Sequence, residues 1–223
     1  MKILVTGGAG YIGSVTVKSL QDEGHEVTVF DNLSYGHRES VSCPLIVGDL
    51  VDREFLFKSF ENQKFDGVIH FAAYALAGES MKDPNKYFFN NLSGGLNLLE
   101  LMKRNQIKNI IFSSTCAVYG TPNKLPVTEE ESKKPESVYG ESKLMFEKIL
   151  QWYDKIFEIK HINLRYFNAA GATLDGSLGE DHSPETHIIP RAINSALSNS
   201  PFLLYGDDYD TPDGTCIRDY IHV

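Results

Sequence analysis

The first thirteen residues constrain the fold more than any other stretch of the chain. Lys2 to Thr6 is a short, apolar, β-branched run, which is typical of a buried parallel strand. Three glycines spaced three apart follow, and from Tyr11 the pattern is helical to Leu20. In strand–turn–helix units, glycines of this kind permit a tight turn, a close approach to phosphate, and close packing of helix on strand. The segment therefore predicts a phosphate-binding helix N-terminus, with a plain structural turn as the alternative.

A carboxylate at the end of the next predicted strand indicates which dinucleotide would bind. Glu26 to Phe30 reads as that strand and is followed by Asp31. A carboxylate here can accept both ribose hydroxyls of an adenosine and repels a 2′-phosphate, so NAD is favoured over NADP. Arg38 is the one nearby feature that favours NADP.

Composition and charge exclude several classes of partner. The chain has 223 residues, 42% of them hydrophobic, and a formal net charge of −9. Such a length is enough to bury a core. The acidic balance argues against nucleic acid or an anionic membrane as partner, although a few local arginines could still hold an anionic small substrate.

Cysteine usage and hydropathy predict a soluble, cytoplasmic protein. Cys43, Cys116 and Cys216 are widely spaced and form no C-x-x-C motif, which favours reduced thiols. The apolar run at the N-terminus is too short for a signal peptide, and no stretch approaches the length of a membrane span.

Strand and helix patterns alternate along most of the chain. Beyond Asn168 the texture changes to loops rich in Gly, Asp, Pro and Thr, with one helix expected at 189–198. We therefore predict an α/β fold, a doubly wound parallel sheet of the Rossmann type, over residues 1–168, and a smaller substrate-binding region over 169–223. The further strands expected are 45–47, 67–71, 108–112 and 161–167, and the further helices are 52–62, 87–104 and 137–157.

Small or polar residues follow the predicted strands where a ligand would bind. The carboxyl ends of parallel strands share one edge of a sheet, and open α/β sheets bind ligands there. Asp49 could contact an adenine amino group or cap the next helix, with equal merit. Ala72 and Ala73 leave room for a flat ligand, or serve helix packing. The residues at this edge are Gly7, Asp31, Asp49, Phe71 and Ser113.

Tyr139 and Lys143 are the candidate catalytic pair. They lie four residues apart on a predicted helix and so share one face. A free phenol has a pKa of about 10. A nearby ammonium and a cationic nicotinamide would both favour the phenolate and so bring it closer to acting as a base near neutral pH. Thr115 follows a strand in a hydroxyl-rich cluster and could orient a substrate hydroxyl toward Tyr139.

Other candidates are weaker. His182 and His187 lie five apart and are flanked by carboxylates, but no third ligand is evident, so no metal site is expected. His70 lies in a predicted buried strand and is interpreted as a hydrogen-bonded core histidine. The chain has no G-x-S-x-G motif, the nucleophile elbow of α/β hydrolases.

Eight motifs together resemble the extended short-chain dehydrogenase/reductase family, and within it the nucleotide-sugar 4-epimerases. The first five are typical of the broad family, and the last three are more particular to the epimerases. They are GGAGYIGS (7–14), DNLS (31–34), HFAA (70–73), SSTCAVYG (113–120), YGESK (139–143), LRYFNAAGA (164–172), GEDHSPETHIIP (179–190) and GTCIRDYIHV (214–223).

The resemblance implies an isomerase of galactose metabolism that interconverts UDP-glucose and UDP-galactose. Tyr139 would take the proton of the 4-hydroxyl while tightly held NAD takes the hydrogen of C4. The resulting 4-keto sugar would rotate and receive that hydrogen on its other face. The resemblance also implies a homodimer formed through the helices at 87–104 and 138–157.

The family's site residues carry over by position. Asn168 and Arg218 would reach the UDP-sugar together with Thr115 and Tyr139, with a surface ion pair to Asp219 as the alternative for Arg218. The residues expected to hold NAD are Gly7, Gly10, Tyr11, Ile12, Gly13, Asp31, Asn32, Asp49, Leu50, Phe71, Ala72, Ala73, Asn90, Ser113, Tyr139, Lys143 and Phe167.

Departures from the family pattern leave alternatives open. Related 4,6-dehydratases have an Asp-Glu pair after the Ser/Thr, whereas Cys116 and Ala117 follow Thr115 here, which disfavours dehydration. The chain ends at Val223, where family members continue, so a C-terminal truncation is expected. The alternatives are a non-catalytic NAD-binding fragment, or a UDP-sugar oxidoreductase or decarboxylase on the same scaffold.

Overall fold

A computed structural model describes all residues, 1–223, and the chain divides into two compact units. Unit 1 is Met1–Tyr166 and unit 2 is Phe167–Val223. Each unit is described separately below. No helix is both long and apolar enough to cross a membrane.

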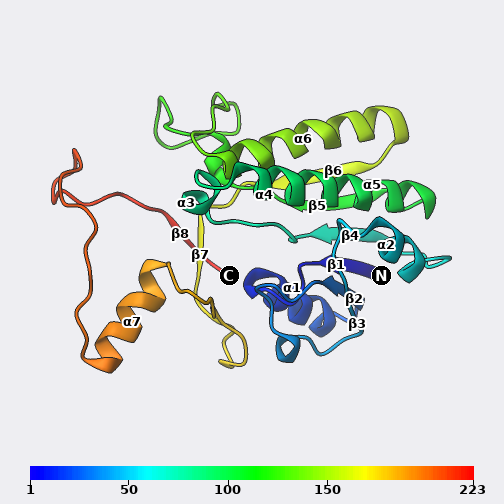
Figure 1. The fold of residues 1–223 in the computed structure, drawn as a ribbon, viewed down its shortest axis with the longest axis horizontal. Coiled ribbons are helices and arrows are strands. Elements are labelled where there is room, and N and C mark those ends of the chain that lie inside the picture. Colours follow the sequence, from blue (N-terminus) through cyan, green and yellow to red (C-terminus); the bar gives the residue numbers. More distant parts are fainter. The chain divides into compact units, whose positions relative to one another are not determined.

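Unit 1 contains a six-stranded parallel sheet in the order β3-β2-β1-β4-β5-β6. The strand order reverses at β1, which places β1 between β2 and β4 (Figure 1). The predicted doubly wound Rossmann-like sheet is confirmed. Its strands are β1 (Lys2–Thr6), β2 (Glu26–Asp31), β3 (Leu45–Val47), β4 (Gly67–His70), β5 (Asn109–Ser113) and β6 (Lys160–Leu164).

Helices cover both faces of this sheet. Figure 1 shows α5 and α6 side by side on one face and α1 on the other. The helices and helical turns of unit 1 are α1 (Tyr11–Asp22), η1 (Arg38–Ser40), α2 (Arg53–Ser59), α3 (Ala77–Ser80), α4 (Pro84–Phe88), the π-helical turn η2 (Phe89–Ser93), α5 (Gly94–Arg104), η3 (Cys116–Val118) and α6 (Val138–Phe157).

Side chains that point alternately to the two faces of the sheet divide the core into two clusters. Leu4 packs with α2, α5 and α6, in a cluster that includes Leu98 and Phe146. Its neighbours in β1, Ile3 and Val5, pack on the other face with α1. Successive strand side chains point to opposite faces, so one buried strand serves both clusters. These layers fix the carboxyl edge of the sheet, where the predicted site residues lie.

Polar residues and one glycine define the helix ends. Ser137 caps α6 by accepting a hydrogen bond from the Gly140 amide at 3.1 Å. Asp52, and not Asp49, caps α2, so that reading of Asp49 is wrong. Gly24 follows α1 with a φ of +78°, the left-handed conformation that glycine adopts freely at the end of a helix.

Unit 2 contains a short parallel pair and one helix. Its elements are β7 (Asn168–Ala170), β8 (Tyr220–His222) and α7 (Ile188–Ser198). Side chains in Thr173 to Leu178 and in Thr211 to Thr215 hydrogen-bond to nearby residues and form compact turns. None of the three cysteines of the chain forms a disulfide.

Several predicted elements differ from the structure. The helix expected at 87–104 begins at Pro84 and is interrupted by the π-helical turn η2. The strand expected at 161–167 ends at Leu164, because Arg165 turns inward to a carboxylate of α6. The strands β7 and β8 were expected as loop.

Candidate functional site

The glycine-rich loop after β1 is shaped for close approach of a ligand to its backbone. Gly7 has a φ of +73°, and a Cβ there would overlap the Ala72 backbone. A Cβ at Gly13 would overlap the Gly7 carbonyl, so Gly13 permits the close packing of α1. At Gly10, by contrast, a Cβ would meet no atom nearer than 3.5 Å, so the protein leaves this side of the loop open.

The N-terminus of α1 carries uncompensated positive character. Gly10 is its N-cap, no side chain caps the helix, and its first turn holds no acidic residue. Tyr11 and Ile12 lie in that turn and are partly buried. Free amides and the helix dipole attract an anionic group, so this loop fits a diphosphate.

Asp31 braces the glycine loop at the end of β2. It is 8% exposed, and its Oδ2 accepts a hydrogen bond from the Ala9 amide at 3.0 Å. Its Oδ1 accepts one from the Leu33 amide at 2.8 Å. A carboxylate has about four acceptor positions, so capacity remains for ribose hydroxyls.

The next two strand ends bring further predicted residues to the same edge. Asn32 donates to Asp49 Oδ2 at 2.9 Å, and Asp49 Oδ1 accepts from the Val51 amide at 2.9 Å. Leu50 is buried and packs in the core cluster. Phe71, Ala72 and Ala73, which follow β4, are partly buried. Ala72 also packs against the main core cluster, so the alternative role expected for it, packing, is observed as well.

Tyr139 and Lys143 lie one helical turn apart on α6, as predicted. The Lys143 ammonium is 5.8 Å from the Tyr139 ring centroid and 4.9 Å from that of Phe112. It donates a hydrogen bond to the Ser113 carbonyl at 2.8 Å. Helix α6 and the end of β5 together therefore fix the lysine beside the tyrosine.

Burial perturbs the protonation of both groups. It lowers the pKa of Lys143 to about 7 and raises that of Tyr139 to about 12, while a hydrogen bond with Thr115 opposes the latter rise. In the protein alone, loss of hydration determines the direction of the Tyr139 pKa shift, and the expected effect of the lysine together with a cationic nicotinamide stays a prediction. A cationic nicotinamide next to Tyr139 would supply a positive charge and so favour the phenolate.

A cluster of hydroxyl groups surrounds the pair. Thr115 is 7% exposed, and its hydroxyl accepts a hydrogen bond from the Ala117 amide at 3.2 Å. Its interaction with the Tyr139 phenol lowers the pKa of that group. The Ser113 hydroxyl hydrogen-bonds Tyr166, a partly buried tyrosine that the sequence analysis did not identify. Thr115 thereby holds a hydroxyl directly beside the phenol.

Glu147 and Arg165 form a buried ion pair behind the catalytic pair, and sequence analysis missed both. Arg165 binds Glu147 in a bidentate manner, with N–O distances of 2.8 and 2.6 Å, and donates to the Tyr119 hydroxyl at 2.8 Å. Ser114 donates to Glu147 at 2.6 Å. The i, i+4 spacing of Glu147 from Lys143 was the available signal. This network ties α6 to the segment that holds Thr115.

Asn91 is a further residue that the sequence analysis missed. It lies in the π-helical turn, is 5% exposed, and hydrogen-bonds the Tyr74 backbone in both directions. Asn91 also donates to the Ser142 hydroxyl on α6 at 3.1 Å, and it accepts a hydrogen bond from the Asn90 side chain. Turns of this type often occur at functional sites.

His70 is buried, as predicted, and hydrogen-bonds Thr6 at 2.7 Å. Its pKa is lowered to about 3 by burial and by the nearby Lys143 charge. The histidine is therefore neutral beside the ammonium. The core interpretation is confirmed.

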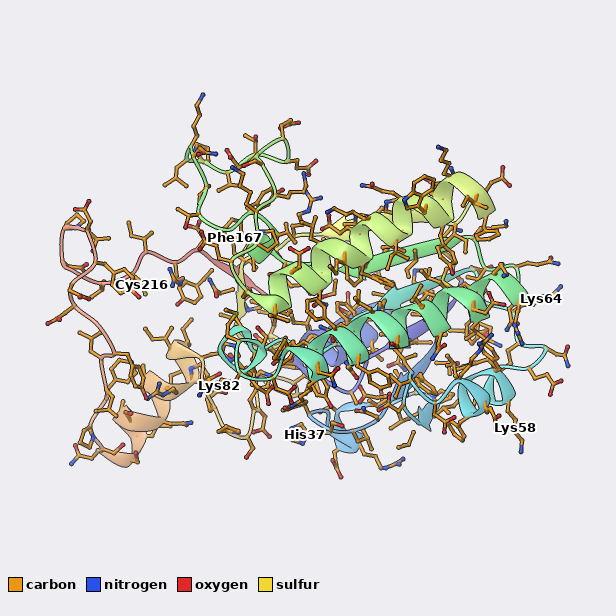
Figure 2. The ribbon with its side chains drawn as sticks, turned by 45° about the horizontal axis from the view of Figure 1, so that its top comes forward. His37, Lys58, Lys64, Lys82, Phe167 and Cys216 are labelled. Carbon is orange, nitrogen blue, oxygen red and sulfur yellow. The ribbon has the colours of Figure 1, made fainter.

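The predicted substrate residues of unit 2 are brought close to one another. Asn168 donates its side-chain amide to the Asp219 carbonyl at 2.8 Å, next to Arg218 in the chain. The Arg218 guanidinium donates to the Ile217 carbonyl at 2.8 Å. Phe167 begins unit 2 with 40% of its surface exposed (Figure 2).

His182 and His187 have carboxylate neighbours, which the sequence pattern showed only as flanking charges. Glu180 and Glu185 both lie against the two imidazoles. The structure therefore supplies the further ligand candidates that were not evident in the sequence.

The two ends of unit 1 differ in character. Figure 2 shows Lys58 and Lys64 at one end of unit 1, away from Lys82. Lys64 precedes β4, whereas Lys82 follows the turn α3 after that strand. The glycine loop, Asp31 and the catalytic pair belong to the carboxyl edge of the strands, where ligands bind in such sheets. Chemically, this edge offers an anion-binding helix end, a ribose-binding carboxylate and a proton donor–acceptor.

Comparison with known proteins identifies relatives over the whole chain. The UDP-glucose 4-epimerases of Lactobacillus helveticus and Streptococcus mutans are 50% and 52% identical to it. In each case the match covers 100% of this chain and 68% of the relative. The chain thus spans about two thirds of their length.

Solved structures give the same result. The UDP-glucose 4-epimerase of Brucella ovis in complex with NAD has a TM-score of 0.95 and 48% identity, covering 99% of this chain and 69% of that one. The Bifidobacterium longum enzyme in complex with NAD⁺ and UDP has a TM-score of 0.94 and 39% identity, covering 100% and 70%. The sequence also matches the NAD dependent epimerase/dehydratase family over residues 3–223. The chain therefore belongs to the NAD dependent epimerase/dehydratase family.

Proposed function

We propose that this protein is an NAD-dependent UDP-glucose 4-epimerase. The observation that carries the proposal is the pairing of Tyr139 and Lys143 beside Thr115, at the sheet edge that holds the glycine loop. The relatives named above, at about half identity over this whole chain, support the same activity.

NAD fits the carboxyl edge of unit 1. The open loop at Gly10 and the uncapped start of α1 would hold the diphosphate, and Asp31 would hold the adenosine ribose. Lys143 would reach the nicotinamide ribose. When bound, NAD supplies reversible hydride acceptance, which epimerisation at a carbinol carbon requires.

The chain's own residues would then move the proton. Thr115 would orient the sugar 4-hydroxyl, and Tyr139 would accept its proton and later return it. A positive charge near the phenol lowers its pKa from about 12 and so activates it only in the loaded site. Asn168 and Arg218 of unit 2 would bind the UDP moiety, since guanidinium matches phosphate in a bidentate manner.

Proton NMR of the purified protein with UDP-galactose tests this proposal. The expected result is the appearance of UDP-glucose anomeric signals with no net formation of NADH. Net NADH formation would favour a UDP-sugar oxidoreductase instead. An unchanged spectrum, with NAD supplied and shown to bind, would favour a non-catalytic NAD-binding protein.

A homodimer is the proposed assembly, and exposed apolar side chains on α5 and α6 support it. Leu96, Met145, Trp152 and Ile156 are between 37% and 60% exposed. Met145, Trp152 and Ile156 recur at helical spacing on one face of α6. Sedimentation velocity should give a dimer that Trp152→Glu converts to monomer, and a wild-type monomer would refute this.

We also propose a cytoplasmic location. The three cysteines, Cys43, Cys116 and Cys216, form no disulfide, which is consistent with a reducing compartment. Imaging of a fluorescent fusion in the source cells would test this.

A further inference from the structure

Two histidines and two glutamates of unit 2 form a compact cluster that the proposed activity does not use. Glu180, His182, Glu185 and His187 each offer one ligand atom, and these atoms lie within 4.8 Å of one another. We propose that this cluster binds a divalent first-row transition cation, for which Zn²⁺ is the natural probe. The proposal does not depend on the epimerase activity.

The distances match those of a four-ligand site. His187 Nδ1 lies 2.6 Å from Glu180 Oε1 and 3.1 Å from Glu185 Oε1. His182 Nδ1 lies 3.3 Å from Glu180 Oε1 and 3.6 Å from Glu185 Oε2. In a tetrahedral zinc site with bonds of about 2.0–2.1 Å, neighbouring ligand atoms are about 3.3 Å apart. Small side-chain adjustments would therefore seat an ion between them.

The charge of the cluster favours a cation. The side chains of Glu180 and Glu185 are only 8% and 15% exposed, and they share the same two imidazoles. Two partly buried carboxylates in one cluster repel each other, and a divalent ion bound between them would neutralise both.

The backbone holds the ligands at both ends of the segment. Gly179, just before Glu180, pairs with Ala172 in an antiparallel bridge. At the other end His187 is the N-cap of α7, and its amide donates to Glu185 Oε1 at 2.7 Å. The ligands thus come from a short segment that is anchored on either side.

The donor set narrows the choice of ion. Two imidazole nitrogens and two carboxylates suit Zn²⁺ or its spectroscopic substitute Co²⁺. Ca²⁺ and Mg²⁺ prefer oxygen ligands, and Mg²⁺ also keeps several waters. Direct histidine–carboxylate ion pairs without a metal are the competing interpretation.

Isothermal titration of the reduced, full chain with Zn²⁺ tests the proposal. One saturable site is expected in the wild type, and binding at least tenfold weaker in both His182→Gln and His187→Gln. The matched controls are His25→Gln in unit 1 and Cys216→Ser in unit 2, which should bind as the wild type does. Circular dichroism would verify that each variant is folded.

A second measurement on the wild type keeps the test decisive if a variant misfolds. Zn²⁺ should shift the imidazole nitrogen resonances of His182 and His187 and leave those of His25 unchanged. No saturable binding, equal binding by all variants, or shifts confined to other histidines would overturn the proposal and leave only the ion pairs.

Discussion

Unit 1 and unit 2 come from one chain but are held together in different ways. Every residue of the two main core clusters lies in unit 1, whereas no residue of 167–223 is buried. On α7 the apolar Ile188, Ile193 and Leu197 are 49%, 52% and 82% exposed. Unit 2 relies instead on short-range turns such as the one around Asp175.

This difference bears on where chemistry can be preorganised. Tyr139, Lys143 and Thr115 belong to elements that a common core fixes in place. Rigid elements hold reacting groups more accurately than loops do. Unit 1 is therefore expected to carry the reaction and most of the stability, and unit 2 to contribute binding groups.

Loss of the Tyr139 hydroxyl is expected to have the largest effect. Tyr139→Phe removes the proton acceptor and should lower the epimerisation rate by about a hundred- to ten-thousand-fold while NAD binding persists. Tyr153→Phe on the same helix is the control and should retain activity. Rates from NMR and NAD affinity from calorimetry give the two readouts. Undiminished turnover of Tyr139→Phe would remove it from the mechanism.

Core truncation should separate the two units in stability. Phe146 is 1% exposed and packs in the main core cluster, so Phe146→Ala should lower the free energy of unfolding by about 3–5 kcal/mol. Leu197→Ala in unit 2 should change it by less than about 0.5 kcal/mol. Urea denaturation of both variants is the measurement. Similar losses from both would break the distinction between the units.

The buried ion pair behind the site should matter more than an exposed one. The Glu147 side chain is 2% exposed, and Glu147→Gln should cost on the order of 3 kcal/mol in unfolding free energy. Asp154 pairs with Lys160 at the surface, with side-chain exposures of 31% and 66%, so Asp154→Asn should cost less than about 1 kcal/mol. Equal costs in urea denaturation would contradict the bracing role of Glu147.

The pH dependence of stability should reveal the buried Lys143. Its pKa is lowered to about 7 in the folded protein from an ordinary 10.5. Between these values the unfolded chain binds more protons, so the free energy of unfolding should rise with pH. The contribution is on the order of 1 kcal/mol per pH unit. Lys143→Met should lack this contribution, and an identical slope in wild type and variant would show that the lysine is not buried as described.

The sequence predicted the parts of the fold that local patterns encode. Hydrophobic runs and the glycines between them predict the first strand, the glycine turn and α1, and these predictions are correct. The π-helical turn could not be predicted, because Asn91 is drawn to Tyr74 and Ser142, which are distant in sequence. The strands β7 and β8 have three residues each and pair across about fifty residues, so no local pattern marks them.

The candidate site was predictable to the same extent. The i, i+4 spacing placed Tyr139 and Lys143 on one face, and parallel strand order placed Asp31 near the glycine loop. Arg165 was missed because its partner Glu147 becomes evident only once β6 lies beside α6. The rise of the Tyr139 pKa in the protein alone was not predicted, because burial is a tertiary property that spacing does not report.

The most direct test of the central claim is calorimetric titration with NAD and with NADP of the protein from which any bound nucleotide has first been removed. The account predicts one NAD site per chain, with NADP at least about tenfold weaker because Asp31 repels a 2′-phosphate. Asp31→Asn should reduce the difference between the affinities for NAD and for NADP. Absence of NAD binding, or a preference for NADP, would contradict the assignment of the carboxyl edge of unit 1 as the cofactor site.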